Sequence, residues 1–124
     1  MNPHQKHVLC VEDDEDTCIM INSLLGLINC EVTSVGTAGQ ARDRIAGGKF
    51  DLYLLDNWLP GGSGIELCRA IREEDSSTPI IFYSGAAYAS DREQAMAAGA
   101  QAYLVKPAEI SRLLDVIKQL LHLT

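Results

Sequence analysis

Five short apolar stretches alternate along the chain with longer segments in which apolar residues recur every three or four positions. The short stretches predict β-strands, and the longer segments predict amphipathic helices. We expect the strands at His7–Val11, Glu31–Val35, Asp51–Leu55, Pro79–Tyr83 and Ala102–Val105. Strands that alternate with helices in this way are typical of a parallel sheet wrapped by helices.

Two of these stretches, Asp51–Leu55 and Pro79–Tyr83, are almost continuously apolar rather than alternating. Such runs are expected of central strands that helices cover on both faces. The chain therefore predicts an α/β fold, a doubly wound five-stranded parallel sheet in the order 2-1-3-4-5 with helices on both faces. In an open sheet of this order, ligands bind beyond the carboxyl ends of the strands, here just after Val11 and Leu55.

Local signals place the ends of several helices. Thr37 with Gln40, and Ser90 with Glu93, have the spacing of capping boxes, in which side chains satisfy the first N–H groups of a helix. Gly99 stands where a helix is expected to stop. The last helix carries a predicted core-facing stripe at spacings of three and four, formed by Ile110, Leu113, Leu114, Ile117, Leu120 and Leu121.

Length and charge limit the classes of protein. A chain of 124 residues has the size of one domain, and no repeat or linker divides it, so we expect one domain over residues 1–124. Seventeen acidic and ten basic residues give a net charge of −7. Because nucleic-acid phosphates attract basic surfaces, direct binding of DNA or RNA by this chain is not expected.

Four cysteines, Cys10, Cys18, Cys30 and Cys68, show neither CxxC spacing nor a neighbouring histidine at ligand spacing. Each lies among apolar residues, so we expect buried or half-buried thiols and a reducing compartment. The polar residues 1–7 lack the apolar core of a signal peptide, and no apolar run approaches the ~20 residues of a membrane span. These features predict a cytoplasmic protein that does not contact a membrane.

Carboxylates gather at the predicted binding edge of the sheet. Glu12 and Asp13 follow the first strand, and Asp56 follows the third. Two unit charges ~4 Å apart at an effective dielectric constant of ~20 repel by about 4 kcal/mol, so such a cluster takes up protons or recruits a cation. An all-oxygen ligand set suits Mg²⁺ or Mn²⁺. The three acidic residues at 14–16 fit the simpler role of favouring a helix N-terminus.

The other two strands end in a hydroxyl group and a cation. Ser84 follows the fourth strand and is followed by Gly85, which lets the backbone approach a ligand closely. Lys106 follows the fifth strand and precedes Pro107, which restricts the lysine backbone to extended geometry. We therefore expect a donor and a positive charge to join the three carboxylates.

Four stretches, VLCVEDDED, LYLLDNWLPGGSG, IIFYSG and AYLVKP, resemble in order and approximate spacing the signatures of response-regulator receiver domains. The resemblance covers essentially the whole chain and implies the flavodoxin-like, chemotaxis-regulator-like fold and a role in a two-component phosphorelay. It makes Asp56 the phosphoacceptor, whose phosphoryl oxygens Ser84 and Lys106 engage. It assigns Mg²⁺ (or Mn²⁺) the ligands Glu12, Asp13, Asp56 and the main-chain carbonyl of Trp58.

The same resemblance implies a signalling switch rather than an enzyme with a turnover substrate. The phosphoryl donor would be a sensor histidine kinase or a histidine phosphotransfer protein. Ser84 and Tyr103 would form the switch, and the Lys106-Pro107 peptide bond would be cis. The altered surface would comprise the fourth helix, the fifth strand and the fifth helix, which would contact an effector domain, a downstream protein or a second copy in a phosphorylation-dependent dimer.

Two positions depart from the usual pattern or bear on the lifetime of the phosphate. Ser63 stands where the family usually has an acidic residue, and it still fits a helix cap. Trp58 is expected to border the phosphorylation pocket, with the small Ala86 on the opposite rim. A bulky indole there would screen attacking water and give slow autodephosphorylation. A contact with a partner, or no role, are alternatives for the same residue.

Two other classes use a similar sheet edge. A haloacid-dehalogenase-type phosphatase needs an aspartate two residues beyond its nucleophile, where this chain has Trp58. A flavodoxin-type module needs a hydroxyl- and glycine-rich phosphate loop after the first strand, where this chain has the acidic run 12–16. Neither pattern matches, so the sequence favours the receiver interpretation.

Overall fold

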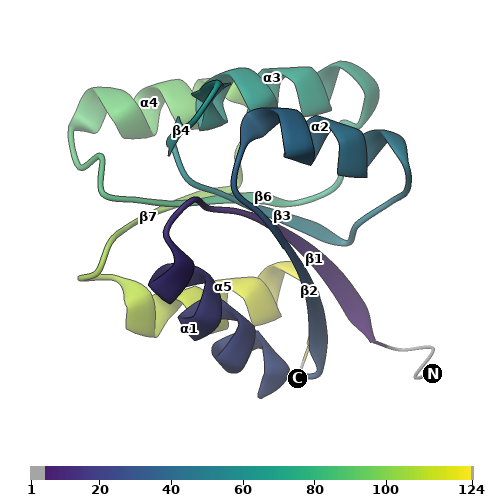
Figure 1. Ribbon diagram of the computed structural model, residues 1–124. Helices are drawn as coiled ribbons and strands as arrows, with labels where there is room; N and C mark the ends of the chain where they lie inside the picture. Colours follow the sequence, from purple (N-terminus) through teal and green to yellow (C-terminus); the bar gives the residue numbers. More distant parts are fainter. Residues whose placement is uncertain (1–4, 124) are drawn as a thin grey trace.

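The computed structural model describes residues 5–123 and has a central parallel sheet with the strand order β2-β1-β3-β6-β7 (Figure 1). This is the predicted order 2-1-3-4-5. Two short strands in a loop, β4 and β5, come before the fourth and fifth strands of the sheet, which are therefore numbered β6 and β7. The N-terminal residues 1–4, part of the segment predicted to lack a leader, lie outside the described residues. The sheet strands are β1 (Lys6–Val11), β2 (Cys30–Val35), β3 (Leu52–Leu55), β6 (Ile80–Ser84) and β7 (Ala102–Val105).

Helices cover both faces of the sheet, as a doubly wound topology requires. In Figure 1, α2, α3 and α4 lie above the sheet, whereas α1 and α5 lie below it. The helices are α1 (Glu15–Gly26), α2 (Ala38–Ala46), α3 (Gly64–Glu74), α4 (Ala89–Ala98) and α5 (Ile110–Leu120). Five predicted strands and five helical segments are therefore confirmed, with half of the strand boundaries shifted by one residue.

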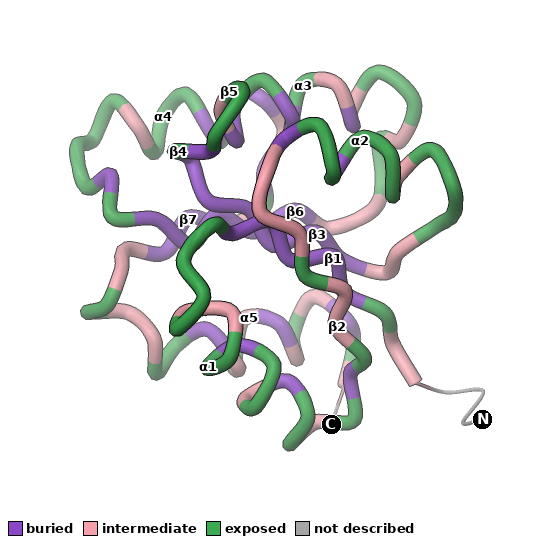
Figure 2. Tube along the Cα trace, in the orientation of Figure 1, coloured by how far each residue is buried: buried purple, intermediate pink, exposed green. Residues whose placement is uncertain are grey.

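The sheet separates two apolar cores. Side chains from alternate positions of β1 enter opposite layers, so that Leu9 packs beneath α2 and α3 whereas Val8 packs against α1 and α5. All residues of β3 and β6 are buried, as their continuous apolar sequences predict (Figure 2). On α5, Leu113 and Ile117 are fully buried and the rest of the predicted stripe is buried or half-buried. Two packed layers hold the strand ends in a fixed arrangement.

The predicted helix caps are confirmed in part. The Thr37 hydroxyl accepts the N–H of Gln40 at 3.1 Å and caps α2. Gly99 ends α4 with φ 114°, a left-handed conformation that favours glycine. The cap predicted at Ser90 is wrong, because the N-cap of α4 is Tyr88, two residues earlier, and Asp91 accepts the N–H of Tyr88 instead. An aromatic residue at the N-cap position gives no capping signal in the sequence.

One element was not predicted. Between β3 and α3 the chain forms a small antiparallel hairpin of β4 (Trp58–Leu59) and β5 (Gly62–Ser63). Gly61, with φ 79°, makes the turn between these strands. The Ser63 hydroxyl then accepts the N–H of Glu66 at 3.1 Å and caps α3, as predicted. The hairpin carries Trp58 out beside the carboxyl ends of the sheet strands.

Candidate functional site

Three carboxylates converge where β1 and β3 end. Backbone hydrogen bonds extend the sheet past each strand, from Glu12 N–H to Val35 at 2.9 Å and from Asp56 N–H to Val11 at 3.0 Å. Glu12 and Asp56 are only 4% and 7% exposed, whereas Asp13 is exposed to solvent. One oxygen atom of each of these three carboxylates lies within 4.8 Å of the others. The structure thus brings together the three residues predicted from their strand-end positions.

Lys106 supplies the positive charge of the cluster. Its backbone N–H donates to the carbonyl of Ser84 at 2.9 Å, and its peptide bond to Pro107 is cis, as the resemblance implied. Its ammonium group donates to Asp56 Oδ2 at 3.1 Å and to Glu12 Oε1. A lysine directly after β7 therefore bridges two acidic side chains that directly follow β1 and β3.

Burial and the neighbouring charges shift the pKa values of Glu12 and Lys106 in opposite directions. Burial raises the pKa of Glu12 above its ordinary value, although the hydrogen bond from Lys106 counteracts part of this effect. Burial alone would lower the pKa of Lys106, but the contacts with Glu12 and Asp56 outweigh it and raise that pKa. Lys106 therefore stays charged at neutral pH. Three carboxylates against one ammonium group leave a net demand for a cation.

The residue type of the cluster fits a hard divalent cation. Carboxylate oxygens from three side chains, with one side open to solvent at Asp13, are the donors that Mg²⁺ and Mn²⁺ prefer. The acidic cluster thus fits the Mg²⁺ site that the family resemblance implied. The neighbouring acidic residue, Asp14, has the simpler role predicted for it, because its side chain accepts the N–H of Thr17 at 3.1 Å and caps α1.

Ser84 and Tyr103 meet behind the cluster through Ala86. The Ser84 side chain is fully buried, and its hydroxyl accepts the N–H of Ala86 at 3.2 Å. The Tyr103 hydroxyl donates to the carbonyl of Ala86 at 2.6 Å, and the tyrosine ring stacks on Phe82 with centroids 5.6 Å apart. Tyr103 is 3% exposed, so the predicted switch residue already lies in a buried position.

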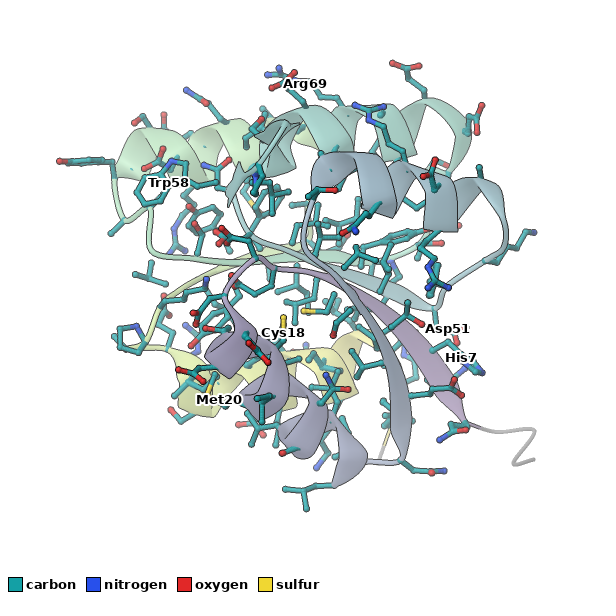
Figure 3. All side chains as sticks on the ribbon, in the orientation of Figure 1. His7, Cys18, Met20, Asp51, Trp58 and Arg69 are labelled. Carbon is teal, nitrogen blue, oxygen red and sulfur yellow. The ribbon has the colours of Figure 1, made fainter. Side chains whose placement is uncertain are left out.

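The rim of the site differs from the sequence-based expectation at one residue. Trp58 is 64% exposed, and its backbone N–H lies 3.4 Å from Asp56 Oδ1. Figure 3 shows the indole beside the strand ends, far from His7 and Asp51 at the opposite edge of the sheet. Ala86, which was expected on the opposite rim, is instead buried at 1% exposure. Gly85 takes the rim position, since a Cβ atom there would lie 3.9 Å from the Trp58 ring.

Two residues near Asp56 were missed by sequence reasoning. Asn57 is 7% exposed, and its backbone carbonyl accepts the N–H of Gly64 at 2.9 Å. A Cβ atom on Gly64 would lie 2.2 Å from the carbonyl oxygen of Asp56, so the first residue of α3 presses directly on the backbone that carries this carboxylate. A glycine at a helix start gives a weak signal, because glycine is common in loops.

Comparison with known proteins gives a consistent result. Residues 8–118 match the model of the response regulator receiver domain family. The transcriptional regulatory protein YkoG of Bacillus subtilis is 36% identical over 116 residues, which cover 94% of this chain and 51% of YkoG. The chain spans about half or less of the length of the curated relatives that it matches.

Solved structures agree in fold. A CheY-like response regulator receiver domain protein of Methanospirillum hungatei superposes with a TM-score of 0.89 at 30% identity, covering 95% of this chain and 94% of that one. The BeF3-activated receiver domain of RstA from Klebsiella pneumoniae gives a TM-score of 0.86 at 30% identity, covering 93% of this chain and 97% of that one.

Within residues 5–123, no helix combines the length and apolar character needed to cross a membrane.

Proposed function

Because the chain belongs to the response regulator receiver domain family, and is thus a signalling switch of a two-component system rather than a turnover enzyme, we propose that Asp56 is its phosphoacceptor. The phosphoryl group comes from a phosphohistidine of a sensor histidine kinase or a histidine phosphotransfer protein. The observation that carries the proposal is the convergence of Glu12, Asp13, Asp56 and Lys106 at the carboxyl edge of the sheet.

The transfer needs position and charge rather than a general acid or base in the chain. An oxygen of the ionised Asp56 attacks phosphorus, the P–N bond of the phosphohistidine breaks, and the departing imidazole takes up a proton. The Lys106 ammonium group, 3.1 Å from Asp56 Oδ2, pairs with the phosphoryl oxygens as negative charge gathers on them. The product is an acyl phosphate on Asp56.

The metal site of the proposal comprises Glu12, Asp13, Asp56 and the main-chain carbonyl of Trp58. When bound there, Mg²⁺ (or Mn²⁺) supplies positive charge that offsets the repulsion between the carboxylates and the incoming phosphoryl group. Glu12 is held in place by Lys106 and by the backbone N–H of Asp14, which donates to Glu12 Oε2 at 3.1 Å. These contacts keep its carboxylate directed at the cluster.

The switch of the proposal runs from Asp56 through Ser84 to Tyr103. The Ser84 hydroxyl donates its O–H to a phosphoryl oxygen, and the movement of its side chain towards that oxygen breaks the hydrogen bond that it now accepts from Ala86 N–H at 3.2 Å. A shift of Ala86 also disturbs the hydrogen bond that its carbonyl accepts from Tyr103. The domain has an inactive and an active state that differ in the surface of α4, β7 and α5, and phosphorylation shifts the population from the first to the second. That surface contacts an effector domain, a downstream protein or a second receiver.

The remaining parts of the proposal concern the whole protein. Residues 1–124 form one receiver domain, and the length of relatives such as YkoG fits a protein in which a further effector domain carries the output. With a net charge of −7, this chain does not itself bind nucleic acid. Four free cysteines support a reducing compartment, the cytoplasm, without membrane contact.

The first experiment incubates the protein with Mg²⁺ and acetyl phosphate and measures intact mass. We expect a mass increase of one phosphoryl group, which disappears in Asp56→Asn and when a chelator removes Mg²⁺. Asp51→Asn is the matched control, because this carboxylate lies at the opposite edge of the sheet, where it accepts the N–H of His7. Phosphorylation that persists in Asp56→Asn would exclude Asp56 as the acceptor.

A second experiment follows the switch by amide NMR with Mg²⁺ and beryllofluoride, a mimic of the phosphoryl group. We expect chemical-shift changes at Asp56 that extend through residues 87–118. Ser84→Ala should keep the local changes but lose the distant ones, because it removes the hydroxyl that links the two regions. Shifts confined to the surroundings of Asp56 would contradict the proposed switch.

The lifetime of the phosphate tests the role of Trp58. Its exposed indole beside Asp56 supports slow autodephosphorylation, because a bulky apolar group at the rim limits the approach of water. We expect Trp58→Ala to lose phosphate faster. The control is Tyr88→Ala, which removes an aromatic side chain that is 79% exposed in the loop between β6 and α4, and it should keep the original rate. An unchanged rate in Trp58→Ala would leave the indole a partner contact or without a role.

A further inference from the structure

Two cysteines face each other between β1 and the first turns of α1. Cys10 is paired in register with Ser34 of β2, and its side chain enters the layer below the sheet. On α1, Asn22 donates to the Ser34 hydroxyl at 3.2 Å and to the carbonyl of Cys18 at 2.9 Å. The helix therefore lies with Cys18 over the same part of β1 and β2 that carries Cys10.

Contacts of the two thiols agree with this placement. The Cys18 thiol donates at 3.4 Å to the carbonyl of Glu12, which lies two residues after Cys10 at the end of β1. Figure 3 shows the Cys18 side chain directed from α1 towards the sheet. Cys10 is 1% exposed, whereas Cys18 is half-buried, so only Cys18 is open to a small solute. The pair thus has one accessible sulfur and one protected sulfur.

We propose that Cys10 and Cys18 form a redox-sensitive pair, which hydroperoxides convert to a reversible disulfide, and that this disulfide weakens cation binding at the neighbouring carboxylates. The second part rests on the proposed function of those carboxylates. The first part concerns only the two thiols and the oxidant.

The chemistry balances with a hydroperoxide as the oxidant. The Cys18 sulfur attacks the outer oxygen, the O–O bond breaks, and the products are a sulfenic acid on Cys18 and an alcohol, or water when the oxidant is hydrogen peroxide. The Cys10 sulfur then attacks the Cys18 sulfur, which forms the S–S bond and releases water. The pair loses two electrons and two protons, and a dithiol returns them by exchange.

The other two cysteines do not compete for this pairing. Cys30 is in register with Lys6, four residues along the strands from the pair of Cys10 and Ser34, which amounts to about 13 Å at the rise of a β-strand. Cys68 lies on α3 and packs in the layer on the opposite face of the sheet. A disulfide requires Cα atoms within about 7 Å. Of the four thiols, Cys10 and Cys18 are the two placed near the carboxyl end of β1 on the face covered by α1.

The disulfide acts on the acidic cluster through Glu12. In the dithiol form, Cys18 donates its S–H to the carbonyl of Glu12, while the Glu12 carboxylate contacts Lys106. Oxidation removes that donor and draws the first turn of α1 towards β1, which displaces the segment carrying Glu12 and Asp13. Loss of such a supporting contact around a metal site costs about tenfold or more in metal affinity. An oxidised protein should therefore need about ten times more Mg²⁺.

The test oxidises the full chain with hydrogen peroxide and maps the product by mass spectrometry without reduction. Cleavage at acidic residues separates Cys10 from Cys18, since residues 12–16 lie between them. Cys18 and Cys30 stay in one fragment, so the mapping is repeated in Cys30→Ala. We expect linked fragments in both proteins, the loss of two hydrogen atoms in mass, and full reversal by dithiothreitol. Cys18→Ser should abolish the link, and Cys68→Ala should keep it.

The same samples are titrated with Mg²⁺, and the fluorescence of Trp58, the single tryptophan, reports binding. Oxidised protein should bind about tenfold more weakly, and oxidised Cys18→Ser should bind like the reduced protein. A missing link, or a link that is lost in Cys30→Ala, would overturn the disulfide. A link with unchanged Mg²⁺ affinity would overturn its effect on the site. If reduced protein showed no response to Mg²⁺, the proposed function would fail, while the mapping would still decide the disulfide.

Discussion

Asp75 shows how one side chain stabilises the exit from a helix. Directly after α3, its Oδ1 atom accepts the N–H groups of Ser77 and Thr78, each at 3.0 Å. Hydrogen bonds from Thr78, followed by that from Ser77, lower the pKa of Asp75 to about 2. The ionised form is therefore favoured in the folded protein, and the turn leading to β6 depends on the charge of this carboxylate.

This charge predicts a pH-dependent effect of Asp75→Ala. The folded pKa of about 2 lies below the unfolded value, so the contribution is complete above about pH 4 and is lost as the pH falls to about 2. At pH 7 we expect the free energy of unfolding to fall by about 1 kcal/mol, after allowance for solvent screening. Urea unfolding at several pH values measures the difference from wild type, which should shrink towards pH 2. The exposed Glu73→Ala is the control and should show little difference at any pH.

At the residue scale, the sequence predicted the positions that end a strand. Glu12, Asp56 and Lys106 each follow an apolar run, and parallel topology places such ends at one edge. Ala86 could not be placed in this way, since its burial depends on how the loop after β6 folds around Tyr103. The position of Cys18 beside the end of β1 also depends on how α1 lies on the sheet, which apolar spacing alone does not determine.

At the scale of elements, α3 and β3 meet at a single close approach. Gly64 begins α3, and its Cα faces the carbonyl of Asp56, where an added Cβ would lie 2.2 Å from the oxygen and 2.8 Å from the ring of Phe82. The Asp56 backbone is fixed by its hydrogen bond to β1, and the Phe82 ring is fixed by the packing of the core. Helix α3 therefore sets the position of the backbone that carries the proposed phosphoacceptor.

Gly64→Ala should consequently shift either the helix or the loop that carries Asp56. We expect a loss of about 1–3 kcal/mol in the free energy of unfolding, the range for overpacked sites, together with weaker Mg²⁺ binding. Gly48→Ala is the matched control, because nothing lies within 4 Å of a Cβ atom at that position. Chemical denaturation and Mg²⁺ titration of both variants test this prediction. Equal stability of Gly64→Ala and the wild type would show that the close approach does not constrain the loop.

Elements were predictable where a period or a side-chain cap marks them. The α5 stripe and the caps at Thr37 and Ser63 follow from spacing and residue type, and both caps form as expected. The start of α4 was misplaced because Tyr88 occupies the cap position and the acceptor is Asp91, three residues later. The hairpin of β4 and β5 was missed because each strand has two residues, which is too short for an alternating pattern.

At the scale of the molecule, the proposed cation site predicts that cation binding is coupled to folding. A ligand that binds only the folded state stabilises it by mass action, by about 2.7 kcal/mol at a concentration of 100 times Kd. We expect Mg²⁺ to raise Tm, and Asp13→Asn to abolish most of that rise. Without Mg²⁺, Asp13→Asn should be at least as stable as the wild type, because one of three clustered carboxylates loses its charge.

Thermal unfolding of Asp13→Asn and the wild type, with and without Mg²⁺, tests this prediction. Asp16→Asn provides the control, since it makes the same change in net charge on the first turn of α1, outside the cluster. It should retain the full effect of Mg²⁺. A similar loss in both variants would mean that net charge, rather than the cluster, governs the response.

The overall topology itself was predictable, because five apolar strands separated by helices allow few arrangements and right-handed crossovers select among them.

The side chain of Arg72 gives α4 one anchored end. Its guanidinium group donates to the carbonyls of Gly99, Asp75 and Thr78 and to the side chain of Gln101, at 2.8–3.0 Å. These bonds tie the C-terminal end of α4 to α3 and to the start of β6. The first six residues of α4 include none that is fully buried. Helix α4 is therefore anchored at Gly99, whereas its exposed N-terminal turns touch the switch residue through Arg92, which lies over the Tyr103 ring. We expect a displacement of Ala86 to move this N-terminal end more than the anchored end.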